Sequence, residues 1–484
     1  MDVSIFFALL EFRKIETSPD LRLTFCLINS KLIKMSARIV THEERKIVFN
    51  NFISLTTLQG VSYLLPLVVL PYLIRIIGIE KFGLIAFAQS LIQYFTILTD
   101  YGFSLSATRK ISLCKDEDCQ TQVSTIFSSV MTVKLLLAGL SFIILCLVIS
   151  LIPKFRNDWL VYILSFGAVI GNTLFPVWFF QGKEKMGYIT LINVIGGVLY
   201  ALCIFIFIKS PKDYLLLPLL NSLLFLISGI WGLHIAFTKF KLEFIFQKYK
   251  DIKSELKTGW DIFTSTVSIN AYTTTRIFAV GLLTNNVITG YFSLADRIAN
   301  FIQTFPMDSF SRAVFPRINK VFARNEKRAL AIMQKIQLGI TSGFVFCLPI
   351  AYYIAPWIIY IVCGNENFVC GREYQEAIIT LRLLLVAVFF VGANAFRVQF
   401  LLVCGKPDLY AKIHVAAAIM GSPLIFLLTY KFSYVGAALA TVLTEAGVFT
   451  VTLIIINKLA REILRNNQGL SVDESSSLPH SKTA

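Results

Sequence analysis

The chain has 484 residues, of which 56% are hydrophobic and 15% are charged, and its net charge is +16 at pH 7. Soluble domains carry about 25% charged residues, so this composition, with a mean hydropathy of +0.70, excludes a water-soluble globular protein. The charged residues lie in short clusters between apolar stretches of about 20 residues, the length that crosses a hydrocarbon core roughly 30 Å thick. The sequence therefore predicts a polytopic, all-α membrane protein.

Twelve apolar stretches are predicted to be transmembrane helices, and an even number places both termini on the same side of the membrane. With the N-terminus inside, the inner loops hold 20 Lys and Arg and the outer loops hold 8. Because positive residues collect in cytoplasmic loops, both termini are predicted to be cytoplasmic. The predicted helices are 50–75, 84–105, 124–152, 158–180, 188–209, 214–238, 259–283, 287–311, 332–362, 376–404, 409–430 and 434–458.

The positive charge is therefore interpreted as a membrane feature, since loop Lys and Arg face anionic headgroups. The chain has 4 His and 9 scattered Cys, most of them in apolar stretches, where Cys behaves as a small hydrophobic residue. No nucleic-acid partner, metal site or cofactor is predicted from this pattern.

The two ends of the chain contain no predicted span. Met35 precedes a basic, polar segment typical of an N-terminus, so translation is expected to start there. The last residues are polar, which favours disorder. The predicted organisation is a non-native extension (1–34), a cytoplasmic N-terminus (35–49), an N-terminal lobe of six helices (50–238), a basic cytoplasmic linker (239–258), a C-terminal lobe of six helices (259–460) and a disordered cytoplasmic tail (461–484).

The two lobes are predicted to be an internal repeat. Gly83–Ala88 in the second helix aligns with Gly290–Ala295 in the eighth, and Phe179–Lys183 aligns with Leu402–Lys406. Because six spans return the chain to its starting side, the halves share one orientation and are related by an axis along the membrane normal. This plan is typical of a transporter with its site between two lobes, although a duplicated structural protein would also show it.

Basic side chains within predicted spans are candidate binding residues, since a charge at membrane depth is costly unless it faces water or a partner. Arg276, Arg297 and Arg397 lie at different depths, and Lys134 lies near mid-depth; Arg75 is added to this set. The planar guanidinium fork suits phosphate oxygens. The pattern favours a cationic cavity for a phosphate-bearing anion. The alternatives are buried ion pairs that lock helices and, for Arg397, a side chain that reaches the interface.

Three acidic residues are candidates for ion coupling or for ion pairs. Asp100 lies near the end of the second predicted helix, where it either relays ions or pairs with Arg109. Asp296 precedes Arg297, which pairs either with this neighbour or with another helix, and Glu445 lies near mid-depth.

Two cysteines flank a short outer loop. Cys363 and Cys370 would form a disulfide if this loop is periplasmic, and they would otherwise stay reduced. Cys114 and Cys119 are predicted to be inside and reduced.

An enzyme is not predicted. The sequence shows no nucleophile–base pattern, Gly-rich nucleotide loop or metal motif, and its longest predicted outer loop is about 13 residues. A membrane glycosyltransferase or polymerase is disfavoured because it would need a larger extramembrane loop for its active site.

Four segments carry a family resemblance: Leu58–Leu67, Pro71–Gly83, Asp100–Thr108 and Trp178–Gly182. They resemble the polysaccharide-transporter family, specifically Wzx-type O-antigen flippases of the multidrug/oligosaccharidyl-lipid/polysaccharide exporter superfamily. The resemblance covers residues 45–460.

The resemblance implies a MATE-like carrier of twelve helices in two lobes in the bacterial inner membrane. The implied cargo is an undecaprenyl-pyrophosphate-linked oligosaccharide, moved to the periplasmic leaflet by alternating access and coupled to an ion gradient. The implied partners are this lipid-linked substrate and membrane lipids, together with an O-antigen polymerase and a chain-length regulator. The main alternative is a multidrug pump of the same fold, whose organic-cation cargo would favour acidic cavities. Another is a lipid II flippase, which would have two further spans.

Overall fold

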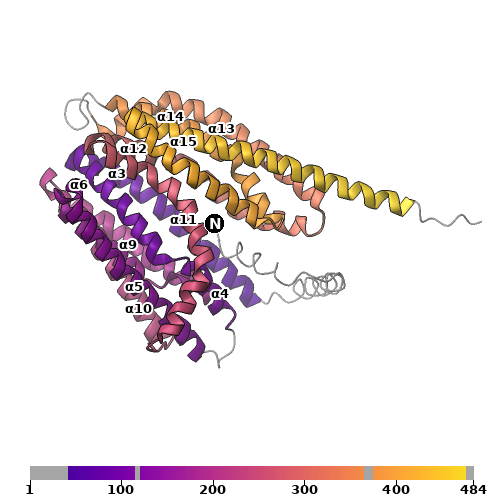
Figure 1. The fold of residues 1–484 in the computed structure, drawn as a ribbon, viewed down its shortest axis with the longest axis horizontal. Helices are drawn as coiled ribbons and strands as arrows, with labels where there is room; N and C mark the ends of the chain where they lie inside the picture. The colour runs from indigo at the N-terminus through magenta and orange to yellow at the C-terminus, as the bar shows by residue number, and fades with distance from the viewer. Residues whose placement is uncertain (1–41, 115–119, 365–373, 476–484) are drawn as a thin grey trace, which may run out of the picture. The chain divides into compact units, whose positions relative to one another are not determined.

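The computed structural model describes residues 42–114, 120–364 and 374–475, and their regular structure is helical throughout. The predicted extension 1–34 and the predicted start at Met35 lie outside the described residues. In chain order the elements are α3 (His42–Asp100), α4 (Phe103–Ser112), α5 (Gln120–Leu151), α6 (Pro153–Arg156), α7 (Trp159–Leu174), α8 (Val177–Gly182), α9 (Met186–Phe207), η3 (Pro211–Leu215), α10 (Leu216–Lys239), α11 (Tyr249–Leu283), α12 (Asn286–Phe322), α13 (Glu326–Cys363), α14 (Tyr374–Val403) and α15 (Pro407–Ser475) (Figure 1).

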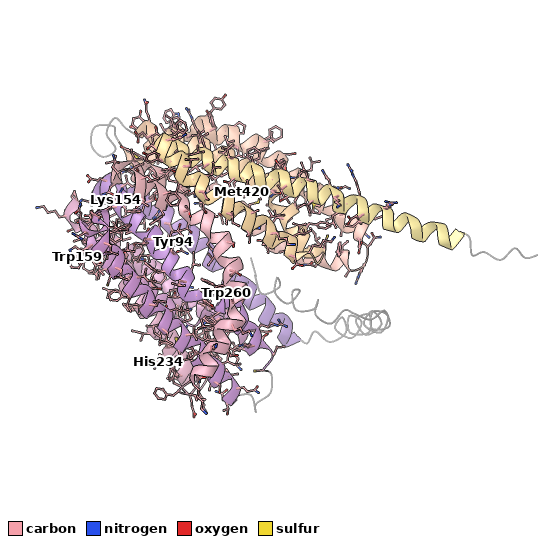
Figure 2. The ribbon with its side chains drawn as sticks, in the orientation of Figure 1. Tyr94, Lys154, Trp159, His234, Trp260 and Met420 are labelled. Atoms are coloured by element: carbon pink, nitrogen blue, oxygen red, sulfur yellow. The ribbon has the colours of Figure 1, made fainter. Side chains whose placement is uncertain are left out.

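Seven helices in the described part of the chain are long and apolar enough to cross a membrane. Large apolar side chains are exposed along many helices, Trp159 and Met420 among them (Figure 2). Such surfaces suit a lipid environment, so the chain is a multi-pass membrane protein. The count of twelve crossings and the cytoplasmic placement of both termini stay predictions. The seven helices are Gln120–Leu151, Trp159–Gly182, Met186–Phe207, Pro211–Lys239, Glu326–Cys363, Tyr374–Val403 and Asp408–Ile463.

Two of the long elements, α3 and α15, each contain two helices joined across a kink. In α3 the break is at Gly78, whose φ of 78° and ψ of 161° are open to glycine but strained for other residues. The sequence predicts a non-helical loop over residues 76–83. In the structure the helix is interrupted at Gly78 alone, and this glycine turns the chain. In α15 the break is at Phe432 and Ser433, between the eleventh and twelfth predicted helices.

The fourth predicted helix, 158–180, is not continuous. It divides into α7 and α8 at Phe175 and Pro176. Proline has no backbone N–H to donate, and its ring keeps the preceding residue out of the helical region. Phe175 accordingly has φ −78° and ψ 107°. The break sets α8 off as a short separate helix.

The predicted linker and one predicted loop are shorter than expected. Only residues 240–248 of the basic linker are non-helical, because α11 already begins at Tyr249. Between α12 and α13 only residues 323–325 are outside a helix. There Asn325 Oδ1 accepts the backbone N–H of Arg328 at 2.8 Å, which is a helix N-cap.

The chain divides into two compact units. One comprises Ala295–Pro356 and Ile378–Ala484, and the other comprises the preceding chain to Leu294 together with Trp357–Ala377. Thus α11 and the first residues of α12 cluster with the N-terminal half of the chain, although the sequence analysis assigned them to the C-terminal lobe. We call the two the N-terminal unit and the C-terminal unit.

The N-terminal unit has an aromatic core between α5, α8 and α10. Phe127 of α5 packs against Trp178 and Phe179 of α8, with ring centroids 5.4 and 5.7 Å apart, and against Phe237 of α10 at 5.7 Å. Phe127, Trp178 and Phe179 are almost fully buried. Aromatic pairs in these tilted and edge-on arrangements stabilise beyond the area that they bury. The core therefore fixes α8 firmly against α5.

Within the N-terminal unit, α3 and α12 cross at two glycines. A Cβ on Gly83 would lie 1.9 Å from Asn286 O and 2.5 Å from Gly290 N, and a Cβ on Gly290 would lie 2.3 Å from Ile79 O. Gly83 and Gly290 are equivalent in the predicted repeat. The close approach leaves room for glycine alone at both positions, and the repeat itself stays a prediction.

Candidate functional site

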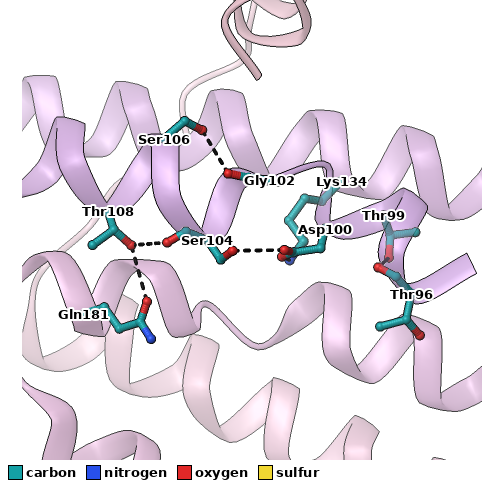
Figure 3. A network of polar contacts seen from close by, with 9 residues as sticks. All are labelled: Thr96, Thr99, Asp100, Gly102, Ser104, Ser106, Thr108, Lys134 and Gln181. Atoms are coloured by element: carbon teal, nitrogen blue, oxygen red, sulfur yellow. Dashed lines mark hydrogen bonds and ion pairs between the residues drawn. The ribbon is translucent and has the colours of Figure 1, made fainter. Parts of the chain in front are cut away.

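An ion pair with one fully buried partner joins α5 to the end of α3 in the N-terminal unit. The side chain of Lys134, on α5, is 2% exposed, that of Asp100 is 29% exposed, and Lys134 Nζ lies 3.6 Å from Asp100 Oδ1 (Figure 3). A buried ammonium group needs a partner of opposite charge. The structure thus joins one residue predicted to bind substrate with one predicted to couple ions or form an ion pair.

The carboxylate of this pair is positioned by the end of α3. Asp100 is the last residue of that helix, and Tyr101 and Gly102 then adopt left-handed backbone conformations with φ of 45° and 74°. The turn starts α4 at Phe103 and brings Ser104 Oγ within 3.0 Å of Asp100 Oδ2, to which it donates (Figure 3). The second predicted helix, 84–105, therefore ends five residues early, and this break places two donors around one carboxylate.

A hydroxyl next to this pair links α4 to α8. Thr108 Oγ1 lies 2.6 Å from Ser104 O and 3.0 Å from Trp178 O, and both carbonyls accept from it. Gln181 Oε1 lies 3.5 Å away (Figure 3). Thr108 therefore connects α4, which carries Ser104, to α8 of the aromatic core.

Each charge of this pair depends on the other. The carboxylate of Asp100 neutralises Lys134, so removal of that carboxylate would leave a buried ammonium group uncompensated. Breaking such a pair from one side is strongly unfavourable. The observed contacts are those of a structural lock between α3 and α5.

Arg276 lies on α11, half-buried and next to a residue that is fixed to α3. The preceding Thr275 is 4% exposed, and its hydroxyl is hydrogen-bonded to that of Tyr94 at 2.7 Å. The ring of Tyr94, labelled in Figure 2, meets the ring of Phe278 edge-on at 5.5 Å. This hydrogen bond and ring contact hold α11 against α3 at residues on either side of Arg276 in the sequence.

Arg75 is placed as a helix cap. Its exposed side chain donates from Nε to Val362 O at 3.3 Å and from Nη2 to Ile361 O. These are carbonyls of the last turn of α13, where a cation also meets the negative end of the helix dipole. The sequence analysis proposed Arg75 for the cavity, and its observed contacts are with α13.

Lys154 makes a similar contact that the sequence analysis missed. Its Nζ donates to Leu282 O at 2.9 Å and to Thr284 O at the end of α11, and it lies 5.8 Å from the centre of the Phe87 ring (Figure 2). Partial burial lowers the pKa of this amine. The sequence shows that Lys154 lies between two predicted spans, but it does not show which helix end this lysine caps.

Two predicted residues lie side by side at the start of the C-terminal unit. Asp296 on α12 is 4% exposed, and its Oδ2 accepts from Asn300 Nδ2 at 2.8 Å. Arg297 follows it and is half-buried, as is Glu445 on α15. The Asp296 carboxylate is therefore supported by a neutral donor one turn along its own helix.

Arg397 on α14 is held against α15. Its Nη1 donates to Ala393 O of its own helix, and its guanidinium carbon lies 5.3 Å from the centre of the Phe449 ring. Stacking on an aromatic face is favourable for a desolvated guanidinium group. Nearby, Asn394 is 4% exposed and donates to Thr452 Oγ1 at 3.4 Å. These contacts are with helix neighbours inside the unit.

The backbone of α14 is bridged one turn before Arg397 by a residue that the sequence analysis did not single out. Gln337 of α13 is 3% exposed, its Nε2 donates to Gly392 O at 3.1 Å, and its Oε1 accepts the N–H of Phe396 at 3.1 Å. An α-helix would join that C=O and that N–H directly. A side chain that inserts between a helical C=O and the N–H four residues later is a recognised cause of helix bending. The available signal was a Gln at the start of the apolar part of α13, where Gln334 also lies.

The predicted residues therefore fall into separate clusters. Lys134 and Asp100 meet in the N-terminal unit, which also contains Arg276, while Arg297 and Arg397 belong to the C-terminal unit. A single cavity that joins them stays a prediction.

Cysteine and metal chemistry add little to this site. Cys363 is disulfide-bonded; its predicted partner Cys370 and the predicted reduced Cys119 lie outside the described residues. Cys114 Sγ donates to Lys110 O at 3.4 Å. Across the described ranges, no group of three or more His, Cys, Asp or Glu is arranged to hold a metal ion.

Comparison with known proteins shows the family to which the chain belongs. The profile of the family described as "Polysaccharide biosynthesis protein" matches residues 48–322. An Escherichia coli K12 protein described as "Putative O-antigen transporter" is 30% identical over 84% of this chain and 97% of its own length. A Shigella dysenteriae protein of the same description is 27% identical over 82% of this chain and 96% of its own.

Solved structures agree on the fold. An inward-facing multidrug resistance MATE family transporter of the MOP superfamily superposes with a TM-score of 0.66 at 13% identity, over 85% of this chain and 99% of that one. The lipid II flippase MurJ, in an inward closed conformation, gives 0.61 at 15% identity, over 90% and 93%. The fold of this chain is therefore that of the MATE and MurJ structures.

Proposed function

Because the chain belongs to the polysaccharide biosynthesis protein family, we propose that it is a flippase for undecaprenyl-pyrophosphate-linked O-antigen repeat units. It moves them from the cytoplasmic to the periplasmic leaflet of the bacterial inner membrane. The observation that carries this proposal is the 30% identity over 97% of the length of the E. coli protein described as an O-antigen transporter.

The proposed binding residues are Arg276, Arg297 and Arg397. Their guanidinium groups offer paired donors to the pyrophosphate, which is the charged part of this substrate. The sugars enter the protein with the pyrophosphate, and the polyprenyl chain stays in the bilayer. The two units then rock to open the site to the other side of the membrane, in the manner of transporters built from two repeats.

The proposed coupling site is the pair formed by Asp100 and Lys134. A proton taken up by the carboxylate removes the negative partner of a 2% exposed ammonium group, which destabilises this conformation and favours another. Asp296 and Glu445 are the corresponding acidic candidates in the C-terminal unit. Proton uptake at one of these acids would drive the return of the empty carrier.

The proposed orientation is the one that the loop charges predict. A disulfide at Cys363 supports a periplasmic position for this end of α13, because disulfides persist in oxidising compartments. Arg75 caps the same helix end, so it is proposed to stabilise the periplasmic side of the carrier.

Complementation tests this function. A strain that lacks its own O-antigen flippase, but makes the matching lipid-linked glycan, would receive residues 35–484. Long-chain surface lipopolysaccharide is expected to return. Arg276→Ala and Arg297→Ala are expected to abolish it at wild-type membrane levels, because each removes a paired donor to the pyrophosphate. The matched control is Arg324→Ala, which removes an exposed arginine between α12 and α13.

Two outcomes would contradict the proposal. Normal export by both arginine variants would remove the cationic site. Absence of surface polymer with the wild-type protein present in the membrane would remove the flippase, and dye efflux by the same cells would then favour the multidrug pump.

A further inference from the structure

The connection between α10 and α11 has a defined, extended course along α5. Side chains at every fourth position of α5 bond to its backbone, and positions with this spacing share one face of a helix. These hydrogen bonds hold a non-helical segment beside the ends of α5 and α10. Gln120 Nε2 donates to Phe240 O and Lys241 O (2.7 and 3.1 Å), the Glu243 N–H donates to Ser124 Oγ (3.3 Å), and the Ile245 N–H donates to Ser128 Oγ (2.9 Å).

This connection turns some apolar side chains inward and others outward. Leu242 is 5% exposed and belongs to the aromatic core. Phe244 and Phe246 are 44% and 93% exposed, and their rings meet edge-on with centroids 6.0 Å apart. Because the backbone is tied to α5, the two rings cannot fold back into the core without losing those hydrogen bonds. They therefore form a fixed, projecting apolar pair.

Lysines surround the pair. Lys239, Lys241 and Lys248 are all exposed, and Glu243 is the one acidic side chain among the described side chains of residues 239–248. Lys239 Nζ also lies 5.5 Å from the centre of the Tyr188 ring. Aromatic rings flanked by lysines are typical of segments that lie in the headgroup region of a bilayer, and the positive charge complements anionic lipid.

The position of the segment fits this partner. It starts where α10 ends, at Lys239, and runs beside the first turns of α5, where seven of the ten residues 120–129 are polar. Beyond Ser129 polar side chains become rare, with Thr132 and Lys134 the two over residues 130–140. That decrease in polar residues marks the boundary between headgroups and hydrocarbon.

We infer that residues 239–248 form a lipid anchor. Phe244 and Phe246 enter the acyl boundary of the leaflet at the cytoplasmic ends of the helices, while Lys239, Lys241 and Lys248 bind the headgroups of anionic phospholipids. The anchor leads directly into α11, so it fixes the base of the helix that carries Arg276 relative to the membrane surface. This inference concerns lipid binding and holds whatever cargo the protein moves.

The depth of Phe246 tests the insertion. An environment-sensitive fluorescent amino acid is placed at position 246 by codon suppression, which leaves all cysteines unchanged, and the protein is reconstituted in nanodiscs. Quenching by lipids spin-labelled near the headgroup is expected, with protection from aqueous iodide. The matched control is the same probe at Glu243, which is exposed on the same segment and should stay accessible to iodide. Iodide quenching at 246 equal to that at 243, or shielding at 246 from both quenchers, would overturn the anchor.

The lysines are tested by lipid preference. Protein extracted from mixed bilayers of phosphatidylglycerol and phosphatidylcholine is examined by native mass spectrometry. The triple variant Lys239→Gln, Lys241→Gln, Lys248→Gln is expected to lose several-fold of the bound phosphatidylglycerol and to remain monodisperse, because these side chains are exposed. Lys431→Gln, at the exposed kink of α15, is the control and should retain it. Equal retention by the triple variant, or equal loss in the control, would contradict a specific anionic-lipid contact.

Discussion

The two units stabilise the positively charged side chains inside them in different ways. In the N-terminal unit, Lys134 is neutralised by the carboxylate of Asp100. In the C-terminal unit, Arg397 is stabilised by a carbonyl of its own helix and by the ring of Phe449, which are both neutral. Lys134 therefore depends on a partner of opposite charge, whereas Arg397 keeps its positive charge beside neutral partners. The comparison shows that a cation inside the protein can be stabilised either by an acid or by a carbonyl and an aromatic ring.

The largest expected effect is the loss of the carboxylate from the first cluster. Asp100→Asn leaves the ammonium group of Lys134 buried without a counter-charge, so the free energy of unfolding should fall by about 3 kcal/mol. Thermal unfolding in detergent micelles measures this. The double variant Asp100→Asn, Lys134→Met removes both charges and is expected to recover most of the loss. A single variant as stable as the wild type would show that the pair contributes nothing to stability.

A smaller effect is expected at the bridge in α14. Gln337→Leu leaves Gly392 O and Phe396 N–H either unpaired or bonded to each other, with a cost of about 1–3 kcal/mol in the first case. In the second case α14 straightens, and hydrogen exchange of a peptide that contains Phe396 should slow. Thr341→Val is the matched control, because it removes the other acceptor of Gln337 Nε2 (3.0 Å) and leaves α14 untouched. Unchanged stability and unchanged exchange in Gln337→Leu would contradict the bridge.

The smallest change in stability is expected at Arg397, where the charge and the shape of the side chain can be varied separately. Arg397→Lys keeps the positive charge and loses most of the stacking on Phe449, which is worth about 0.5–1 kcal/mol. Export of surface polymer should drop more than thermal stability does, because an ammonium group lacks the paired donors that suit pyrophosphate. Arg397→Gln, which also removes the charge, should export less than Arg397→Lys. Export by the Gln variant equal to that of the Lys variant would remove the charge from the mechanism.

Apolar stretches predicted the helical fold well, because a chain in lipid must bond its backbone internally. The boundaries were less accurate where one residue decides them. Pro176 breaks a predicted helix, and Gly78 turns the chain where an eight-residue gap was expected. Both residue types are visible in a sequence, but their effect depends on whether neighbouring helices accept the bend.

The candidate residues were chosen by residue type and not by partner. Lys134 and Asp100 are both charged residues within predicted spans, yet nothing in their spacing of 34 positions indicates that they form a pair across helices. Gln337 was missed because its role depends on the exposed backbone of another helix. Pairings of this kind arise from packing, which a single sequence does not record.

The contact between Gly83 and Gly290 limits how the sequence can vary at this crossing. A Cβ at Gly83 would lie 1.9 Å from Asn286 O, and a Cβ at Gly290 would lie 2.3 Å from Ile79 O. Any larger residue at either position would therefore push α3 and α12 apart. A substitution at one of the two positions cannot be offset at the other, because glycine is already the smallest residue.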